Sequence, residues 1–171
     1  RGVRAAPGSL MLFWFVGGSA LLVWGVFQSR GVDYRTVMRG SLVPFVDLLT
    51  GGPWVAHTLL VSALALGGVM LATRNRRLVR RRWLGVPIGW MLHLVLDATW
   101  SDPGQFWWPA FGTSFAEGGL PEFSRGGLGV LLEFAGLGAL LILYRQGGLS
   151  DPAQRQAFLN TGRIEGPVMD R

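Results

Sequence analysis

The sequence predicts an all-α fold, an integral membrane bundle of about four transmembrane helices with a short interfacial or re-entrant segment before the second. Two observations lead to this prediction. Half of the 171 residues are hydrophobic and only 15% are charged. The apolar residues also gather in four runs of about 18 residues or more, the length that crosses a bilayer. A water-soluble domain of this length needs more polar surface and fewer uninterrupted apolar runs.

The four runs are predicted as spans in chain order. The first, residues 8–27, is longer than the apolar core of a signal peptide, about 7 to 15 residues, so we expect a retained helix. The second, 54–72, follows Thr-Gly-Gly-Pro, which is typical of a helix start. The third, 83–100, is closed by Ser-Asp-Pro-Gly, and the fourth, 126–144, ends in Arg-Gln-Gly-Gly. Residues 1–146 therefore form the predicted transmembrane domain.

Three further segments complete the predicted architecture. Residues 41–52 are apolar but too short to cross a bilayer, which indicates an interfacial or re-entrant half-helix. Residues 101–125 are rich in Gly, Pro and aromatic side chains, and we expect a loop partly folded back onto the membrane. Residues 147–171 are polar, and the sequence Ser-Asp-Pro predicts the start of one short helix in a loose C-terminal tail.

The distribution of arginine predicts the orientation. All sixteen basic residues are Arg, and six of them lie in residues 74–82, whereas the loop 101–125 holds Arg125 alone. The positive-inside rule places the six-Arg loop and both termini in the cytoplasm. Arg30, Arg35 and Arg39, in the first predicted outer loop, do not follow this rule. Because the Arg residues flank apolar spans, membrane lipids are the expected partners and nucleic acid is not.

Four ionisable side chains lie within the predicted spans, namely His57, His93, Asp97 and Glu133. Such a side chain costs a few kcal/mol at the centre of a membrane helix, so it needs a partner or a function. His93 and Asp97 are spaced i, i+4, which places them on one helix face. Counted from the outer boundary at 1.5 Å per residue, all four fall in the outer half of the membrane. Asp47 reaches the same layer from the segment before the second span.

Two His and up to three carboxylates match the nitrogen and oxygen ligands of a divalent metal such as Zn, Mn or Fe, and hydrolysis is the natural chemistry of such a site. The alternative interpretation is that the same side chains make interhelical hydrogen bonds that hold the bundle together. The chain has no Cys, which excludes disulfides and thiolate ligation. It also lacks a P-loop, a GxSxG motif and an HExxH motif.

Over residues 41–112 the chain resembles a family of bacterial inner-membrane proteins classed as metal-dependent hydrolases, some of them under LexA control. The resemblance rests on "HLVLDATWSDPGQFWWP", on "GGPWVAHTLLVSAL" in place of the family's His-Ser, and on "VPFVDLL" in place of its Pro-Asp-x-Asp. The chain departs from the family in lacking a His-Arg pair before His57 and in having Phe45 at one acidic position. It is similar to a divergent, actinobacterial-type member.

The residues and the resemblance together predict a multi-pass protein of the bacterial inner membrane. It would hydrolyse a phosphate- or ester-containing lipid-like substrate at the extracytoplasmic face. His57, His93 and Asp97 are the expected metal ligands, with Asp47 as a ligand or general base and Glu133 as a supporting partner or fourth ligand. The alternative is a non-catalytic accessory subunit of a larger membrane complex. A transporter is less well supported, because no polar stripe continues into the inner leaflet.

Overall fold

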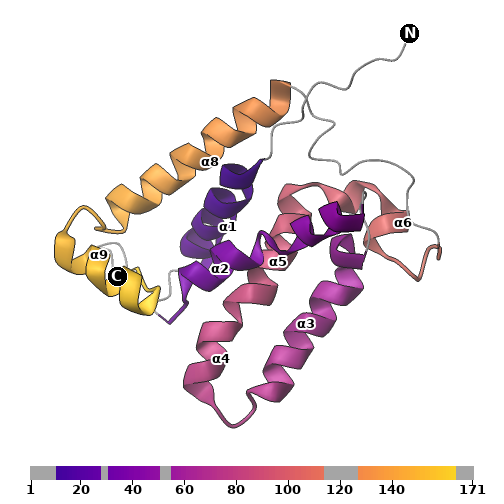
Figure 1. Cartoon of the computed structure of the whole chain (residues 1–171), viewed down its shortest axis with the longest axis horizontal. Coiled ribbons are helices and arrows are strands. Elements are labelled where there is room, and N and C mark those ends of the chain that lie inside the picture. Colours follow the sequence, from indigo (N-terminus) through magenta and orange to yellow (C-terminus); the bar gives the residue numbers. More distant parts are fainter. Residues whose placement is uncertain (1–10, 28–30, 51–54, 114–126, 165–171) are drawn as a thin grey trace.

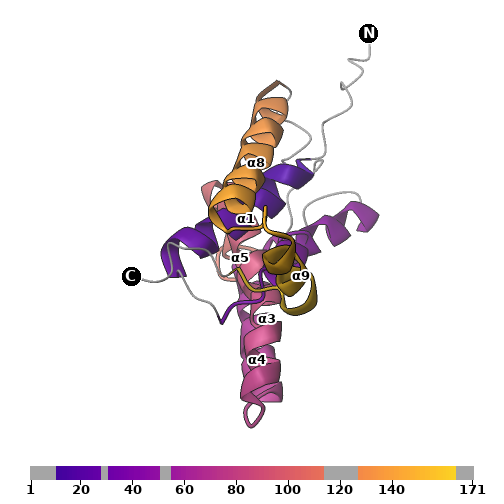
Figure 2. The same cartoon turned by 90° about the vertical axis from the view of Figure 1, so that its left-hand side faces the viewer.

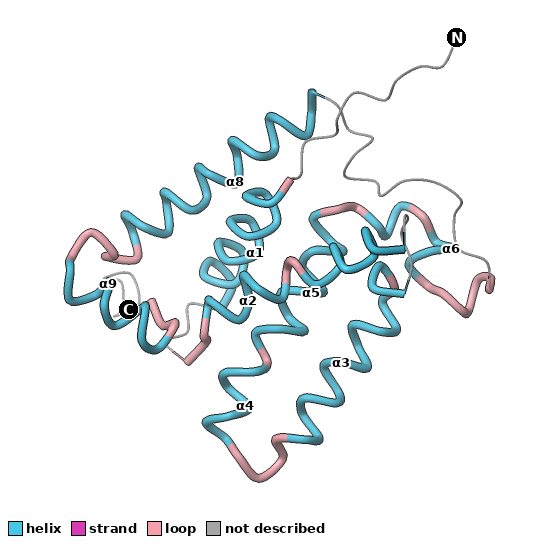
Figure 3. Tube along the Cα trace, in the orientation of Figure 1, coloured by secondary structure: helices cyan, strands magenta, loops and turns pink. Residues whose placement is uncertain are grey.

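Helices make up all the regular structure in the part of the chain that the computed structural model describes, residues 11–27, 31–50, 55–113 and 127–164. No strand occurs in these ranges, which confirms the all-α class (Figure 3). The longest elements are α1 (Leu12–Phe27), α3 (Leu59–Ala72), α5 (Gly85–Leu96) and α8 (Gly127–Gln146). The shorter ones are α2 (Tyr34–Gly40), η1 (Val43–Thr50), η2 (Val55–His57), α4 (Arg77–Trp83), η3 (Thr99–Ser101), α6 (Pro103–Phe106) and α9 (Pro152–Thr161).

The helix lengths differ from the apolar runs that predicted them. Within the described ranges, α8 is the one helix long and apolar enough to cross a bilayer by length and composition, whereas α1 and α3 are apolar but shorter. α5 ends at Leu96 because Ala98 adopts the left-handed conformation, with φ of 56°, which an α-helix cannot continue through. His57 precedes α3 rather than lying within it, since Thr58 caps that helix by accepting a hydrogen bond from Val61 N.

α1 and α8 pack side by side and run in the same direction (Figure 1). They cross at Gly17 and Gly136, where a methyl group on either residue would overlap the backbone of the other helix. Four spans that crossed the bilayer alternately would make the first and last helices antiparallel. The parallel arrangement therefore requires an additional return path in the segment between α1 and α3.

α2 and η1 provide this return path. α2, which the sequence analysis did not predict, packs along α5, and η1 continues from it toward the start of α3 (Figures 1 and 2). Gly40 and Gly89 allow the close approach, because a Cβ atom on Gly40 would meet the carbonyl of Val86 and one on Gly89 the carbonyl of Val37. η1 itself lies at the predicted half-helix. The chain thus runs down α1, up α2 and η1, down α3, up α4 and α5, and down α8.

The C-terminal segment contains α9, the one short helix that the sequence predicts, and residues 147–164 are docked onto the bundle; residues 165–171 of the predicted tail lie outside the described residues. Asp151 caps α9 by accepting a hydrogen bond from Ala153 N. At the other end of α9, the carbonyl of Gly162 accepts a hydrogen bond from Tyr34 N at 2.8 Å. The side chain of Ile164 is 1% exposed and packs in the core cluster that joins α1, α2 and α8.

Candidate metal centre

His57, His93 and Asp97 come together from three places in the chain: η2, the last turn of α5 and the residue that caps α5. All three side chains are buried, with exposed fractions of 0%, 0% and 1%. One possible ligand atom of each lies within 4.8 Å of those of the other two. The structure thus brings together the three residues that the sequence analysis named as metal ligands. We call them the His–His–Asp cluster.

The ring of His93 is held in one orientation. Its Nδ1 atom lies 2.7 Å from the carbonyl oxygen of Ser41, and because a carbonyl oxygen only accepts, Nδ1 carries the proton and donates it. In a neutral imidazole the lone pair is then on Nε2. Phe15 stacks on the same ring, with the centroids 3.8 Å apart. The sequence gives no signal for the Ser41 carbonyl, because a backbone group in a turn leaves no pattern of residue types.

His57 is oriented by Asp47. The Nδ1 atom of His57 lies 2.8 Å from Oδ2 of Asp47, and both side chains are buried. With Nδ1 donating to the carboxylate, Nε2 of His57 is again the nitrogen with the lone pair. A carboxylate behind a ligating histidine is a common arrangement in metal sites, where it fixes the tautomer and makes the ring more basic. Asp47 is thus placed behind His57, as an orienting group.

Asp97 is held by a neighbour and by the helix end. Thr99 donates a hydrogen bond from Oγ1 to Oδ2 of Asp97 at 2.9 Å. The backbone N–H of Asp97 donates to the carbonyl of His93 at 2.8 Å. The carboxylate therefore lies buried at the C-terminal end of α5, where the helix dipole disfavours negative charge. A cation in the His–His–Asp cluster would offset this cost.

The donor set fits a divalent metal ion. Two imidazole nitrogens and one carboxylate oxygen are the protein ligands of hydrolytic zinc sites and of iron sites with open coordination positions. Atoms bound to one tetrahedral ion at 2.0–2.2 Å lie about 3.4 Å apart. The three ligand atoms, within 4.8 Å of one another, are therefore in the range from which side-chain movement can bring them onto one ion.

Glu133 lies away from the His–His–Asp cluster. Its Oε2 atom accepts a hydrogen bond from the backbone N–H of Trp14 at 3.0 Å, in the first turn of α1. Backbone N–H groups at the start of a helix lack partners within the helix, and a carboxylate there is favourable. The structure therefore gives Glu133 the role of joining α8 to α1, as the hydrogen-bonding interpretation expected, and does not group it with His57, His93 and Asp97.

Phe45 occupies space beside the His–His–Asp cluster. Its ring meets that of His93 edge to face, with the centroids 5.5 Å apart. This is the position at which the resembled family has an acidic residue. An apolar ring here adds no ligand, and it reduces the room for water on that side of His93. Phe45 itself therefore contributes no ligand to the cluster.

An apolar cavity lies between the start of α3 and residues 106–110, at the end of α6 and after it. It has a volume of about 280 Å³, and it is lined by Leu59, Leu60, Ala63 and residues 106–110. Leu59 is two residues beyond His57 in the chain. Residues 106–110 of the aromatic loop that the sequence predicted to fold back onto the membrane form one wall of this cavity, and residues 114–125 of that loop lie outside the described residues.

Comparison with known proteins adds no relative. No protein-family model matches the chain, no curated protein is significantly similar to it, and no solved structure matches its fold.

Proposed function

We propose that the chain is a multi-pass membrane protein. The outward faces of its long helices are apolar, as shown by Leu64 and Leu71 on α3 and by Leu131 and Phe134 on α8, which are 63–74% exposed. The interior also holds polar side chains, and Ser62 is among the fully buried ones together with the two His. A soluble protein rarely exposes apolar surface of this extent, whereas a bilayer covers it.

The proposed topology differs from simple alternation of four spans. α1 and α8 run parallel, so the start of α1 and the end of α8 lie on opposite sides. The Arg-rich α4 and the helix α9 lie at the same end as the start of α2 (Figure 1), and the positive-inside rule makes this the cytoplasmic end. Arg35 then lies on the cytoplasmic side, as the positive-inside rule expects. In the topology predicted from the sequence, Arg35 lay in an outer loop and did not follow that rule. The His–His–Asp cluster falls toward the opposite, outer side.

The function that this geometry supports best is metal-dependent hydrolysis. His57, His93 and Asp97 would hold the ion, and Asp47 and Thr99 would keep two of them in the binding orientation. A divalent metal in such a site polarises a phosphoryl or carbonyl oxygen and lowers the pKa of a water molecule. The observation that carries the proposal is the convergence of three buried ligand atoms within 4.8 Å of one another.

The substrate class follows from the neighbouring apolar cavity. The cavity of about 280 Å³ is lined almost entirely by apolar side chains, and Leu59 in its wall is two residues from His57 in the chain. An acyl or prenyl chain fits such a lining, whereas a sugar or a peptide would leave polar groups unpaired. We therefore propose a lipid-like substrate whose phosphate or ester group reaches the cluster while its hydrocarbon chain occupies the cavity.

A second candidate function is that of a non-catalytic subunit of a membrane complex. Two observations favour it. Phe15 and Phe45 pack on His93 where a catalytic site would admit water, and Trp90 donates an interhelical hydrogen bond to the carbonyl of Ala56 at 2.7 Å. In this case the buried polar groups stabilise the bundle alone. Co-purification with fixed partners in mild detergent, without bound metal, is the expected result for this alternative.

The test of hydrolysis uses the full chain in phosphatidylcholine vesicles. Release of phosphate from an added lipid phosphate monoester, and of fatty acid from a phospholipid, is measured with Zn²⁺, Mn²⁺ or Fe²⁺ and again after chelation. We expect metal-dependent turnover that Asp97→Asn reduces at least about tenfold, by analogy with the loss on disturbing metal-site groups. Glu133→Gln, the matched carboxylate outside the cluster, should retain turnover. Equal rates for the wild type and Asp97→Asn with every metal would contradict the proposal.

A further inference from the structure

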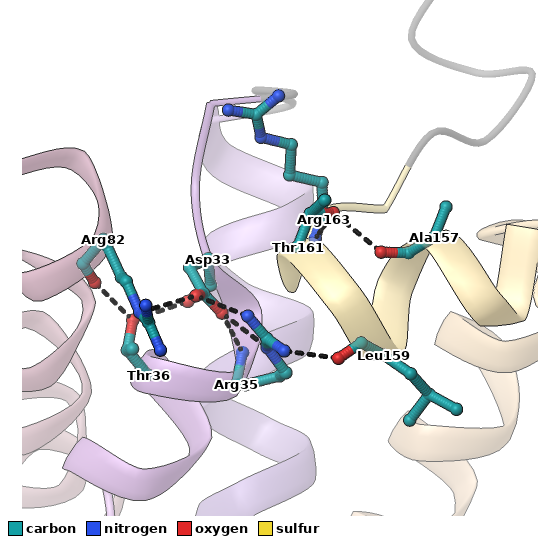
Figure 4. Close-up of polar contacts among 8 residues, drawn as sticks. All are labelled: Asp33, Arg35, Thr36, Arg82, Ala157, Leu159, Thr161 and Arg163. Atoms are coloured by element: carbon teal, nitrogen blue, oxygen red, sulfur yellow. Dashed lines mark hydrogen bonds and ion pairs between the residues drawn. The ribbon is translucent and has the colours of Figure 1, made fainter. Parts of the chain in front are cut away.

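A second polar site lies at the opposite end of the bundle, where the start of α2, the last turn of α4 and the end of α9 meet (Figure 4). Here a cavity of about 280 Å³ is lined by charged and polar side chains. We call it the arginine pocket, and its polar walls include Asp33, Arg35, Arg81, Arg82, Thr161 and Arg163. Arg82 is eleven residues before His93, about 16 Å along a helix, so the pocket is separate from the His–His–Asp cluster.

The framework of the arginine pocket is fixed by hydrogen bonds in which, within the described residues, the guanidinium groups of Arg81 and Arg163 take no part. Thr36 donates from Oγ1 to the carbonyl of Arg82 at 2.8 Å, which joins α4 to α2. The guanidinium group of Arg35 donates to the carbonyl of Leu159 on α9 (Figure 4). These contacts, with that between Tyr34 N and the Gly162 carbonyl, position the three elements without the side chains of Arg81 and Arg163.

The charges in the arginine pocket are unbalanced. Four Arg residues are among the described residues that line it, against the single carboxylate of Asp33. That carboxylate already interacts with Arg35, through contacts of 3.1 and 3.0 Å, and it lies 3.9 Å from Nε of Arg82. The hydrogen bond to Asp33 raises the pKa of Arg35, which keeps it charged. The described lining therefore carries a net charge of +3, and an anion would relieve the repulsion between its cations.

We propose that the arginine pocket binds a phosphate or diphosphate group. Guanidinium groups bind phosphate oxygens through paired, charge-assisted hydrogen bonds, and several Arg residues around one cavity favour a multiply charged anion. The volume of about 280 Å³ is many times the roughly 10–15 Å³ that one water molecule needs by the same measure, so the cavity has room for a diphosphate.

Two kinds of ligand could bring a phosphate group to the arginine pocket, namely an anionic lipid and a soluble phosphate compound. In the proposed topology the pocket lies at the cytoplasmic surface of the bilayer, where basic pockets bind the phosphate groups of anionic lipids. A soluble phosphate compound would reach it from the cytoplasm. Both use the same guanidinium groups, and neither requires the metal centre or its activity. The inference therefore goes beyond the proposed hydrolysis and is independent of it.

The experiment compares two double variants of the full chain in detergent micelles. Arg81→Gln with Arg163→Gln removes two charges from the pocket, and Arg77→Gln with Arg155→Gln removes two exposed charges from the same helical segments outside it. Binding of inorganic pyrophosphate is measured by calorimetry, and binding of phosphatidic acid by native mass spectrometry, with phosphatidylcholine as the neutral lipid. Arg163→Gln alone serves if the pocket double variant does not fold.

We expect the pocket variant to bind at least one phosphate probe about tenfold more weakly than the wild type, and the control variant to differ less than about twofold. Loss confined to pyrophosphate identifies a soluble source, and loss confined to phosphatidic acid identifies a lipid headgroup. Loss of both identifies the phosphate group itself. A wild type that binds neither probe, or equal weakening by both double variants, would overturn the proposal.

Discussion

The His–His–Asp cluster and the arginine pocket lie at opposite ends of α5, and they hold their polar groups differently. In the cluster each side chain is buried and fixed by a short hydrogen bond, such as that between His93 Nδ1 and the Ser41 carbonyl at 2.7 Å. In the arginine pocket the framework is fixed, but guanidinium groups such as that of Arg82, 63% exposed, extend into an open cavity.

Because of this difference, we expect the cluster to select its ligand by coordination geometry and the arginine pocket to select its ligand by charge. Buried, oriented ligands favour an ion of defined coordination, because each donor atom has one available direction. Flexible, exposed cations favour a class of anion, because solvent and salt weaken each individual contact. Substitutions should therefore affect stability and metal affinity strongly at the cluster, and mainly ligand binding at the pocket.

The largest effect is expected for His93→Ala. This change removes a fully buried ring stacked on Phe15 and leaves the Ser41 carbonyl without its donor. Cavity formation and the lost hydrogen bond should lower the free energy of unfolding by about 3 kcal/mol and abolish metal binding. Unfolding in mixed detergent micelles and elemental analysis measure the two effects. A variant as stable as the wild type would show that His93 is not packed as described.

Asp47→Asn should have the next largest effect, on metal affinity rather than on folding. The amide oxygen still accepts the hydrogen bond from Nδ1 of His57, so the ring stays in place, but the negative charge behind it is lost. Changes to such orienting carboxylates weaken metal binding by about 10- to 100-fold. Competition with a metal chelator measures the affinity. An unchanged affinity would remove Asp47 from the metal centre.

Tyr34→Phe tests the packing at the arginine-pocket end of the bundle through the pH dependence of the protein's stability. Tyr34 is fully buried, its hydroxyl has no hydrogen-bond partner within the described ranges, and burial raises its pKa to about 12. The unfolded chain loses this proton near pH 10, so the wild type should lose about 2 kcal/mol of stability between pH 10 and 12.

The matched experiment follows thermal unfolding of the wild type and Tyr34→Phe from pH 8 to 12. At pH 8 the variant should be at least as stable as the wild type, because the lost hydroxyl is buried and makes no hydrogen bond in the described structure. Above pH 10 the variant should be the more stable of the two. Parallel pH profiles for both proteins would contradict the burial of the hydroxyl.

The smallest effect on stability is expected for Arg81→Gln. Its side chain is exposed and takes no part in the hydrogen bonds that dock α2, α4 and α9. The free energy of unfolding should change by less than about 0.5 kcal/mol, as for other surface charges. The same denaturation assay measures it. A loss as large as that for His93→Ala would mean that the arginine pocket is a structural element.

The sequence predicted the all-α class and the residues of the cluster, because both follow from local patterns. The spacing of His93 and Asp97 by four residues required a shared helix face, and the burial cost of charged groups in apolar runs singled them out. Counting residues from the span ends then placed His57 at a similar height. Each of these inferences uses only distance along the chain or along a helix axis.

The position of Glu133 could not be predicted by counting residues along a helix. Such counting gives Glu133 the same height in the membrane as His93, but height does not determine which side of a bundle a residue faces. α8 packs on α1, and Glu133 therefore meets the backbone of Trp14. Lateral position depends on which helices touch, and here Gly17 and Gly136 determine that contact. A glycine pair indicates close packing but does not identify the partner.

The arginine pocket was missed for a related reason. The sequence assigned Arg35 to an outer loop and Arg82 to a cytoplasmic one, because α2 is too short and too polar to be recognised as a return path. The contact of Thr36 with the Arg82 carbonyl brings these segments to one end. The left-handed turn at Ala98, which ends α5 at the cluster, was also not predictable, because alanine is otherwise a strong helix former.

The central claim is that His57, His93 and Asp97 hold a divalent metal ion, and elemental analysis of the purified full chain tests it most directly. The wild type and Glu133→Gln should each contain about one equivalent of Zn, Mn or Fe, and the His93→Ala, Asp97→Ala double variant should contain none. Absence of stoichiometric metal from the wild type, with or without added metal salts, would contradict the account, as would equal metal content in the double variant.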